Sequence, residues 1–130
     1  MPELNFTPEQ RAAIDTRGST VLVSAAAGSG KTRVLTERLM AYLTDAENPV
    51  DIDRFLVITY TRAAAAELRS RILDGIYARI ASDPENRRLR RQVALCARAE
   101  IGTIHSFCAD FLRANCAALA LAPDFQVADA

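Results

Sequence analysis

The 130-residue sequence has no excess of charge of either sign and no long hydrophobic run. Its 16 lysines and arginines balance its 16 aspartates and glutamates, so the formal net charge is zero. Overall charge therefore does not favour nucleic-acid binding, and such a role has to rest on local patches. No apolar segment approaches the length needed to cross a bilayer, so we expect no membrane association.

Cysteine is scarce, and the few cysteines that occur do not suggest a metal site. Cys96, Cys108 and Cys116 are odd in number and form no C-x-x-C pair. Their spacings fit no common zinc or iron–sulfur pattern. We expect them to be small buried apolar residues in a reducing compartment. The first five residues are acidic and lack an apolar core, unlike a secretory signal, so a cytoplasmic location is expected.

The most informative stretch of the chain is a loop of small residues, AAAGSGKT, at positions 25–32. It consists of Ala25, Ala26, Ala27, Gly28, Ser29, Gly30, Lys31 and Thr32. An apolar run precedes it and a helical pattern follows, which is the context that a phosphate-binding loop requires. Backbone amides at the start of a helix bind anions, Lys31 can reach the outer phosphates, and the Thr32 hydroxyl suits magnesium. The strict phosphate-loop pattern has glycine at the position of Ala25. The alternative interpretation of this stretch is an alanine-rich turn that leads into a helix without binding phosphate.

The remaining patterns predict alternating strands and helices. Thr7, Pro8 and Gln10 predict a helix over 8–15 with a capping box, and a second helix follows the loop. Further helices are expected over 62–80, 85–97 and 105–118, and strands over 19–24, 55–60 and 100–104. This order predicts an α/β fold with a parallel sheet, whose ligands lie at the carboxyl ends of the strands.

Polar and aromatic residues follow the second and third expected strands. They are Thr59, Tyr60, Thr61 and Arg62 after one strand, and Thr103, His105 and Ser106 after the other. Hydroxyl groups and ring faces in such a row suit a single nucleic-acid strand. Taken singly, Tyr60 is more typical of a core tyrosine, and His105 of a capping or core histidine.

Four arginines lie close together at positions 87–91, among apolar residues of one expected helix. A run of charge of this kind is usually a solvated helix face, which is the interpretation we favour. Contact with a nucleic-acid backbone is the alternative.

Taken together, these motifs resemble the UvrD-like superfamily 1 helicases. The resemblance rests on residues 4–10, the loop at 25–32, TYT at 59–61 with AAAAEL at 63–68, and TIHSFC at 103–108, in that order. Residues 47–54 and 123–129 are similar to the AddA branch of this family, the helicase–nuclease components of bacterial AddAB-type recombination complexes.

The resemblance implies a partial motor domain: residues 1–130 would be the front part of the ATP-binding domain (subdomain 1A), with a three-layer, RecA-like P-loop NTPase fold. ATP and Mg²⁺ are the implied cofactors, with Lys31 and Thr32 as catalytic residues and Thr32 at the metal. Gln10 would read the adenine, and Arg33 matches a base-contacting arginine. The strand-end residues named above match motifs that contact DNA. The implied partners are DNA, single- or double-stranded, and an AddB-type nuclease subunit. The implied process is recombinational repair of double-strand breaks.

The sequence also departs from a complete ATPase site. No run of four apolar residues followed by Asp or Glu comes after the phosphate loop, although magnesium binding and hydrolysis call for such an acid. We therefore expect the chain alone to bind nucleotide and single-stranded DNA without useful ATP turnover. The alternatives are a small P-loop kinase, with residues 87–91 as its lid, and a DNA-binding module with a vestigial loop.

Overall fold

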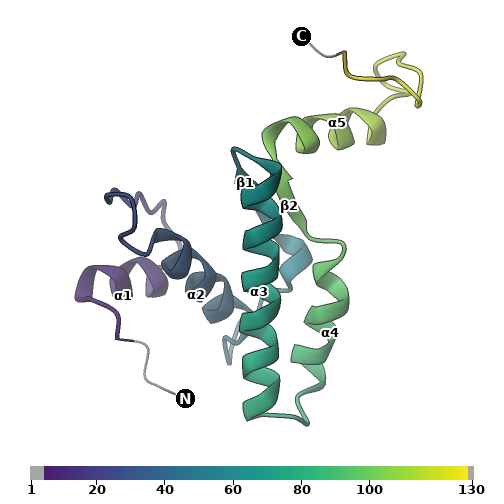
Figure 1. Ribbon diagram of the computed structural model, residues 1–130. Helices are drawn as coiled ribbons and strands as arrows, with labels where there is room; N and C mark the ends of the chain where they lie inside the picture. The colour runs from purple at the N-terminus through teal and green to yellow at the C-terminus, as the bar shows by residue number, and fades with distance from the viewer. Residues whose placement is uncertain (1–4, 129–130) are drawn as a thin grey trace.

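The computed structural model describes residues 5–128, which form an α/β arrangement around one long central helix (Figure 1). The α-helices are α1 (Pro8–Asp15), α2 (Lys31–Leu43), α3 (Arg62–Ser82), α4 (Arg87–Cys96) and α5 (Ile104–Ala114). A 3-10 helix, η1 (Ile52–Arg54), precedes the strands β1 (Leu56–Thr59) and β2 (Glu100–Thr103). No helix among the described residues is both long and apolar enough to cross a bilayer.

The two strands pair in parallel, and α3 and α4 form the crossover between them (Figure 1). Val57 lies opposite Ile101 in the register, and both side chains are buried against α3. Because strand side chains alternate between faces, Leu56 and Ile58 lie on the opposite face, where they are 50% and 44% exposed. The sheet is therefore covered on one face and bare on the other within residues 5–128. The predicted parallel α/β arrangement is confirmed, whereas a full three-layer fold is not formed by these residues.

The strand predicted over residues 19–24 is not formed. This segment is irregular, and its apolar side chains Leu22 and Val23 are 91% and 45% exposed. A β-strand needs a neighbour that takes up its backbone hydrogen bonds, and β1 and β2 pair only with each other in the described part of the chain. Residues 19–24 thus have the hydrophobic pattern of a strand, but no strand among residues 5–128 pairs with them.

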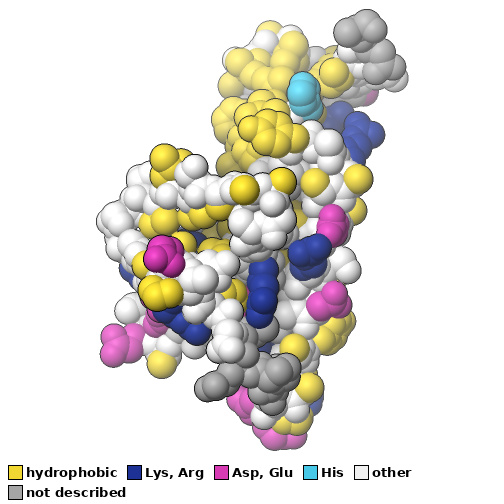
Figure 2. All heavy atoms as spheres, turned by 60° about the vertical axis from the view of Figure 1, so that its left-hand side comes forward, with side chains coloured by type: hydrophobic (Ala, Val, Ile, Leu, Met, Phe, Trp, Pro, Cys, Tyr) yellow, Lys and Arg dark blue, Asp and Glu magenta, His cyan; other side chains and the backbone are white. Residues whose placement is uncertain are grey.

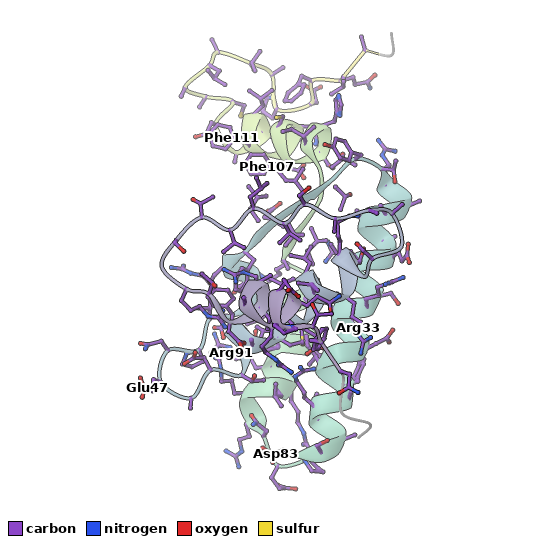
Figure 3. The ribbon with its side chains drawn as sticks, turned by 90° about the vertical axis from the view of Figure 1, so that its left-hand side faces the viewer. Arg33, Glu47, Asp83, Arg91, Phe107 and Phe111 are labelled. Carbon is purple, nitrogen blue, oxygen red and sulfur yellow. The ribbon has the colours of Figure 1, made fainter. Side chains whose placement is uncertain are left out.

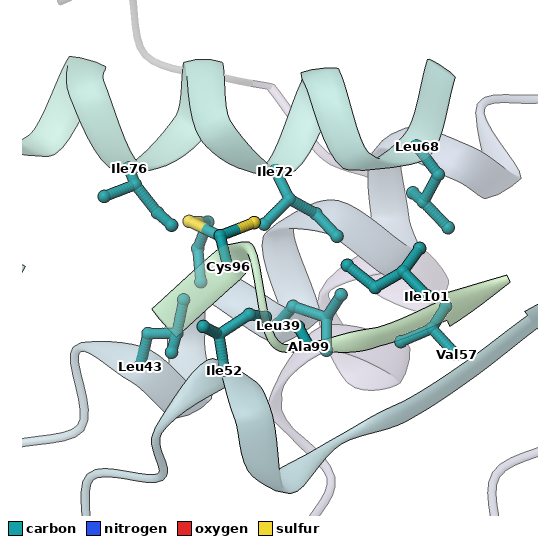
Figure 4. Packing of buried hydrophobic residues seen from close by; sticks show 11 residues of the cluster. Leu39, Leu43, Ile52, Val57, Leu68, Ile72, Ile76, Cys96, Ala99 and Ile101 are labelled. Atoms are coloured by element: carbon teal, nitrogen blue, oxygen red, sulfur yellow. The ribbon is translucent and has the colours of Figure 1, made fainter. Parts of the chain in front are cut away.

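The core lies between the inner face of α3 and the elements packed on it (Figure 4). Leu68, Ile72 and Ile76 recur every four residues and are almost fully buried, as the sequence predicts. Gly75, on the same helix, lets α2 approach closely, since an added Cβ would lie 3.2 Å from the Met40 sulfur. A glycine that weakens the helix locally therefore allows two helices to pack.

The cysteines do not share one environment. Cys96 is buried, and burial raises the pKa of its thiol, so it is a neutral member of the core as expected. Cys108, in contrast, is exposed on α5, and Cys116 is half-buried. The prediction of three buried cysteines is therefore wrong for Cys108, because much of the surface of α5 is left uncovered.

The arginine-rich helix α4 is tied to η1 by a polar cluster. The Arg88 guanidinium lies 2.6 Å from the Asp51 carboxylate. The buried Gln92 amide donates to Asp51 (2.7 Å) and accepts from the Ile52 backbone N–H (2.9 Å). The hydrogen bond from Gln92, aided by Arg88, lowers the pKa of Asp51 against the opposing effect of burial. Part of the predicted basic face thus has a structural role, and α4 lies across α3 from the phosphate loop (Figure 1).

Candidate nucleotide and DNA site

The loop at residues 25–30 leads directly into the first turn of α2. Gly28 and Gly30 have φ angles of 77° and 84°, in the left-handed region that other residues rarely adopt. Gly30 occupies the N-cap of α2 and offers no side chain, so the first amides of this helix lack a side-chain cap. A curved loop that ends on uncapped helix amides can bind an anion such as a phosphate.

Lys31 folds back into this loop. Its Nζ atom donates to the backbone carbonyls of Ala25 and Ala26, each at 2.7 Å. Lys31 is also the only lysine of the chain, since the other basic residues are all arginines. The ammonium group is flexible and compact, so it can exchange these carbonyls for a phosphate oxygen. The structure thus places one mobile positive charge inside a loop suited to phosphate.

Gln10 makes the predicted capping contact and a second contact that the sequence did not predict. Its side-chain oxygen accepts from the Thr7 N–H at 3.0 Å, and its own N–H donates to the Thr7 hydroxyl at 3.3 Å, which completes the capping box of α1. Its Nε2 atom donates to the Ser29 carbonyl of the phosphate loop at 3.3 Å. The same side chain lines a cavity of about 530 Å³ between α1 and residues 21–25. Gln10 therefore links the cap of α1 to the loop, while its contact with adenine stays a prediction.

Arg33 lies beside the loop in an aromatic contact that the sequence did not suggest. Its guanidinium is 4.9 Å from the centroid of the Phe6 ring, and that of Arg11 is 5.3 Å from the same ring. Arg33 is labelled in Figure 3. These cation–π contacts hold Arg33 next to the N-terminus of α1, where Gln10 also lies. Phe6 therefore positions Arg33, a residue of the candidate site. Phe6 was not identified from the sequence, although it lies only four residues before Gln10.

The rest of α1 is fastened to α2 through Arg38. Its Nη1 atom donates to the carbonyls of Ala13 and Ile14 at the end of α1, and its Nη2 atom lies 3.3 Å from the Tyr42 hydroxyl. Arg17 stacks over the Tyr42 ring at 4.0 Å. These contacts fix α1 on α2 and so hold Gln10 near the phosphate loop.

Thr32 is exposed in the first turn of α2, directly after Lys31. A magnesium site needs several oxygen ligands, usually with a carboxylate among them. Among residues 5–128 there is no cluster of three or more acidic, histidine or cysteine side chains that could hold a metal. The described residues thus offer one hydroxyl ligand next to a phosphate site, and magnesium stays a prediction.

The ends of β1 and β2 lie side by side, because Thr59 pairs with Thr103 in the register. Beyond them, Tyr60 is fully exposed, and Arg62 and His105 are also exposed. The alternatives of a core tyrosine and a core histidine are therefore wrong, and Thr103 and Ser106 rather than His105 cap α5. Hydrophobic side chains gather over the end of the molecule that carries α5 (Figure 2). An exposed ring, a cation and an imidazole therefore follow two strand ends that are neighbours in the sheet.

The hydroxyl residues of the two strand ends act mainly as caps. Thr61 caps α3, accepting from the Ala64 N–H at 3.0 Å, and the Thr59 hydroxyl donates to the Thr61 carbonyl at 3.0 Å. Thr103 and Ser106 form the capping box of α5. Thr103 is only 7% exposed, and its buried hydroxyl accepts from the Ser106 N–H and so holds the helix start, while its contact with DNA stays a prediction. Ser106 remains exposed as well as capping.

Comparison with known proteins decides the family. The UvrD/REP helicase N-terminal domain matches residues 6–130, almost the whole chain. The chain belongs to this family. It is 53% identical over 125 residues to an ATP-dependent helicase/nuclease subunit of Clostridium acetobutylicum, and 53% identical over 124 residues to that of a Thermoanaerobacter species. The corresponding protein from Clostridium beijerinckii is 49% identical over 129 residues.

These alignments cover 95–99% of this UvrD/REP helicase N-terminal domain but 10% of each relative. The chain thus spans about a tenth of the length of the curated relatives that it matches. The resemblance to UvrD-like helicases is confirmed, as is the similarity to the helicase/nuclease subunits. The activities in the relatives' names belong to proteins much longer than this chain.

Proposed function

We propose that this chain is the ATP- and DNA-binding front part of the first motor domain (subdomain 1A) of a DNA helicase/nuclease that acts in double-strand break repair and recombination. ATP would bind at the loop formed by residues 25–32, and single-stranded DNA would run across the ends of β1 and β2. Hydrolysis and nuclease chemistry would be completed by segments beyond these residues.

The observation that carries this proposal is the loop itself. Lys31 Nζ lies against the carbonyls of Ala25 and Ala26, beside uncapped amides of α2. A phosphate bound there would be surrounded by N–H donors and one ammonium group, which is how such loops stabilise the charge of a triphosphate. Gln10 donates to the Ser29 carbonyl of the loop, and Arg33 lies over Phe6 near the start of α1, so both are close to a nucleotide bound in the loop, which supports their proposed contact with the base.

The bare face of the sheet supports the finer fold assignment, a three-layer RecA-like domain. Leu56 and Ile58 are exposed on one side, and Leu22 and Val23 are exposed on the segment predicted as a strand. Apolar residues on unpaired strand segments are favourable when further strands and helices bury them. We propose that later segments of the polypeptide supply these neighbours, and with them the acidic residue for Mg²⁺ beside Thr32.

The partners follow from the family and stay part of the proposal. The relatives are each named as one subunit of a helicase/nuclease, which describes a component of an assembly. We propose that the companion of this protein is an AddB-type nuclease subunit, that DNA is the substrate, and that the location is the bacterial cytoplasm.

A small P-loop kinase fits the structure less well. Its lid would have to close over the phosphate loop, but residues 87–91 lie across α3 from that loop (Figure 1). Arg88 is engaged by Asp51, and Arg90 donates to the Pro84 carbonyl. Stimulation of ATP hydrolysis by single-stranded DNA, compared with phosphate transfer to small acceptors, separates the two functions.

Tyr60→Ala tests the DNA surface. In the protein encoded by the complete open reading frame, we expect this change to weaken binding of a fluorescein-labelled dT20 strand about tenfold, because stacking of a base on an aromatic ring is lost. Fluorescence anisotropy at fixed salt measures the affinity. Tyr60→Phe keeps the ring and should bind like the wild type.

Tyr77→Ala is the matched control, since Tyr77 is an exposed tyrosine on α3, away from the strand ends. It should leave the affinity unchanged. Equal affinities for the wild type, Tyr60→Ala and Tyr77→Ala would contradict a DNA contact at Tyr60.

A further inference from the structure

A cavity of about 690 Å³ lies between α5 and the chain segment at residues 125–127. This volume falls within the range of small-molecule and cofactor sites, about 300–1,000 Å³. Its walls come from the starts of α3 and α5, the length of α5 and the C-terminal segment. Sequence patterns marked Arg62, His105 and Ser106 as strand-end residues but did not indicate a cavity, because residues 104–113 and 125–127 meet only in the folded chain.

The inner walls are mainly apolar. Ile104, Leu112 and Val127 contribute aliphatic side chains, and Phe125 contributes an aromatic ring. The Arg113 guanidinium lies 5.3 Å from the Phe125 ring centroid, so a cation–π contact anchors this ring to α5. A flat apolar group of modest size therefore meets an aromatic side chain that is already held in place.

The polar groups of the cavity favour a ligand that carries negative charge at its open side. Asp110 is the carboxylate of the lining, and Arg113 pairs with it at 3.0 Å, which offsets its charge. Arg62 and His105 also line the cavity, and both are exposed. Arg62 therefore leaves a positive charge at the rim, complementary to phosphate, and the His105 imidazole adds a hydrogen-bonding group.

We propose that this cavity receives one base of a single DNA strand, whose phosphates lie along Arg62 and His105. The proposal rests on the DNA surface proposed above and extends it past the strand ends into a pocket. The base would stack against Phe125, and the Gln126 amide would offer a donor and an acceptor to its edge. Residues outside the strand-end motifs, such as Phe125 and Gln126, would then help to fix the position of the DNA strand on the protein.

Phe125→Leu is the test variant, because it keeps an apolar side chain but removes the ring. In the protein from the complete open reading frame, we expect its affinity for dT20 to fall about tenfold. Its affinity for a strand of equal length built from abasic sites should equal that of the wild type, because only the base enters the cavity. Phe111→Leu is the matched control: Phe111 is an exposed phenylalanine of α5 that does not line the cavity.

Cys108 offers a second measurement that needs no substitution. Its thiol is exposed and lines the cavity, whereas Cys116 does not line it. Bound dT20 should slow alkylation of Cys108 by iodoacetamide, the abasic strand should not, and Cys116 serves as the reference in peptide mass spectrometry. Equal protection by both strands would overturn the proposal, because the backbone alone would then cover the thiol.

The outcomes separate this cavity from the wider proposal. If Tyr60→Ala weakens binding but Phe125→Leu does not, and Cys108 is unprotected, the pocket is refuted and the DNA surface stands. If the wild type binds neither strand, both are refuted. If Phe125→Leu weakens both strands equally, the ring supports the local fold and the proposed base contact is refuted.

Discussion

Lys31→Ala is expected to lower ATP hydrolysis by the complete protein at least about a hundredfold, because removal of one preorganised charge-stabilising donor costs about 10²–10³ in kcat. Lys31 is the only lysine of the chain, and its Nζ lies 2.7 Å from two loop carbonyls, inside the loop proposed to hold the phosphates. A phosphate-release assay in the presence of excess single-stranded DNA measures the effect.

The matched control for this prediction is a cationic residue with an exposed salt bridge. Arg71 pairs with Glu67 on the surface of α3, where such a pair contributes little. Arg71→Ala should therefore keep the wild-type rate. Turnover by Lys31→Ala within a fewfold of the wild type would show that the loop does not carry the chemistry.

The second large effect concerns the core. Ile72 is fully buried on α3 and packs in the cluster that contains Leu68, Ile76 and Ile101 (Figure 4). Ile72→Ala removes methyl groups and leaves a cavity, which costs about 2–5 kcal/mol. We expect the slowest backbone amides of α3 to exchange about a hundredfold faster, measured by hydrogen–deuterium exchange and mass spectrometry of the complete protein.

Tyr77→Ala provides the comparison on the same helix, because Tyr77 is 54% exposed. Its effect should stay within about 0.5 kcal/mol, so the exchange of α3 should change little. Similar exchange in the wild type and Ile72→Ala would mean that α3 is not the helix around which this part of the protein is built.

The sequence predicts best where structure depends on neighbouring residues. Helix α1 spans Pro8–Asp15 and carries its capping box because Thr7, Pro8 and Gln10 act within one turn. The helix predicted over 62–80 is α3, which begins at the predicted residue and extends two residues further, to Ser82. The ends of strands β1 and β2 differ from their predicted positions by at most one residue, as is usual at element boundaries.

Prediction fails where structure depends on distant residues. Residues 19–24 have the pattern of a buried strand, yet they lack a pairing neighbour in the described chain. Arg69 is another example: it donates to the carbonyls of Cys96, Ala99 and Ile101, and so ties α3 to the end of α4 and to β2. Nothing in the local sequence distinguishes this arginine from the exposed ones.

The candidate site likewise has parts that the local sequence predicts and parts that depend on the fold. The phosphate loop and the Thr7–Gln10 box are local and were located by pattern, whereas the contact of Gln10 with Ser29 spans 19 residues and needed the fold. Helix α5 and residues 125–127 form a cavity whose lining includes motif residues such as His105, but the motifs alone do not show that these two segments meet. Phe107 and Phe111, whose ring centroids lie 6.2 Å apart on α5, likewise show a grouping that depends on the helix having formed (Figure 3).

A crystal structure of the complete protein with Mg²⁺ and a non-hydrolysable ATP analogue is the most direct test of the claim that residues 25–32 bind a triphosphate. We expect phosphate oxygens on the backbone amides of residues 28–32, with Lys31 Nζ moved from the Ala25 and Ala26 carbonyls onto a phosphate. A nucleotide bound elsewhere, with Lys31 still on those two carbonyls, would contradict it.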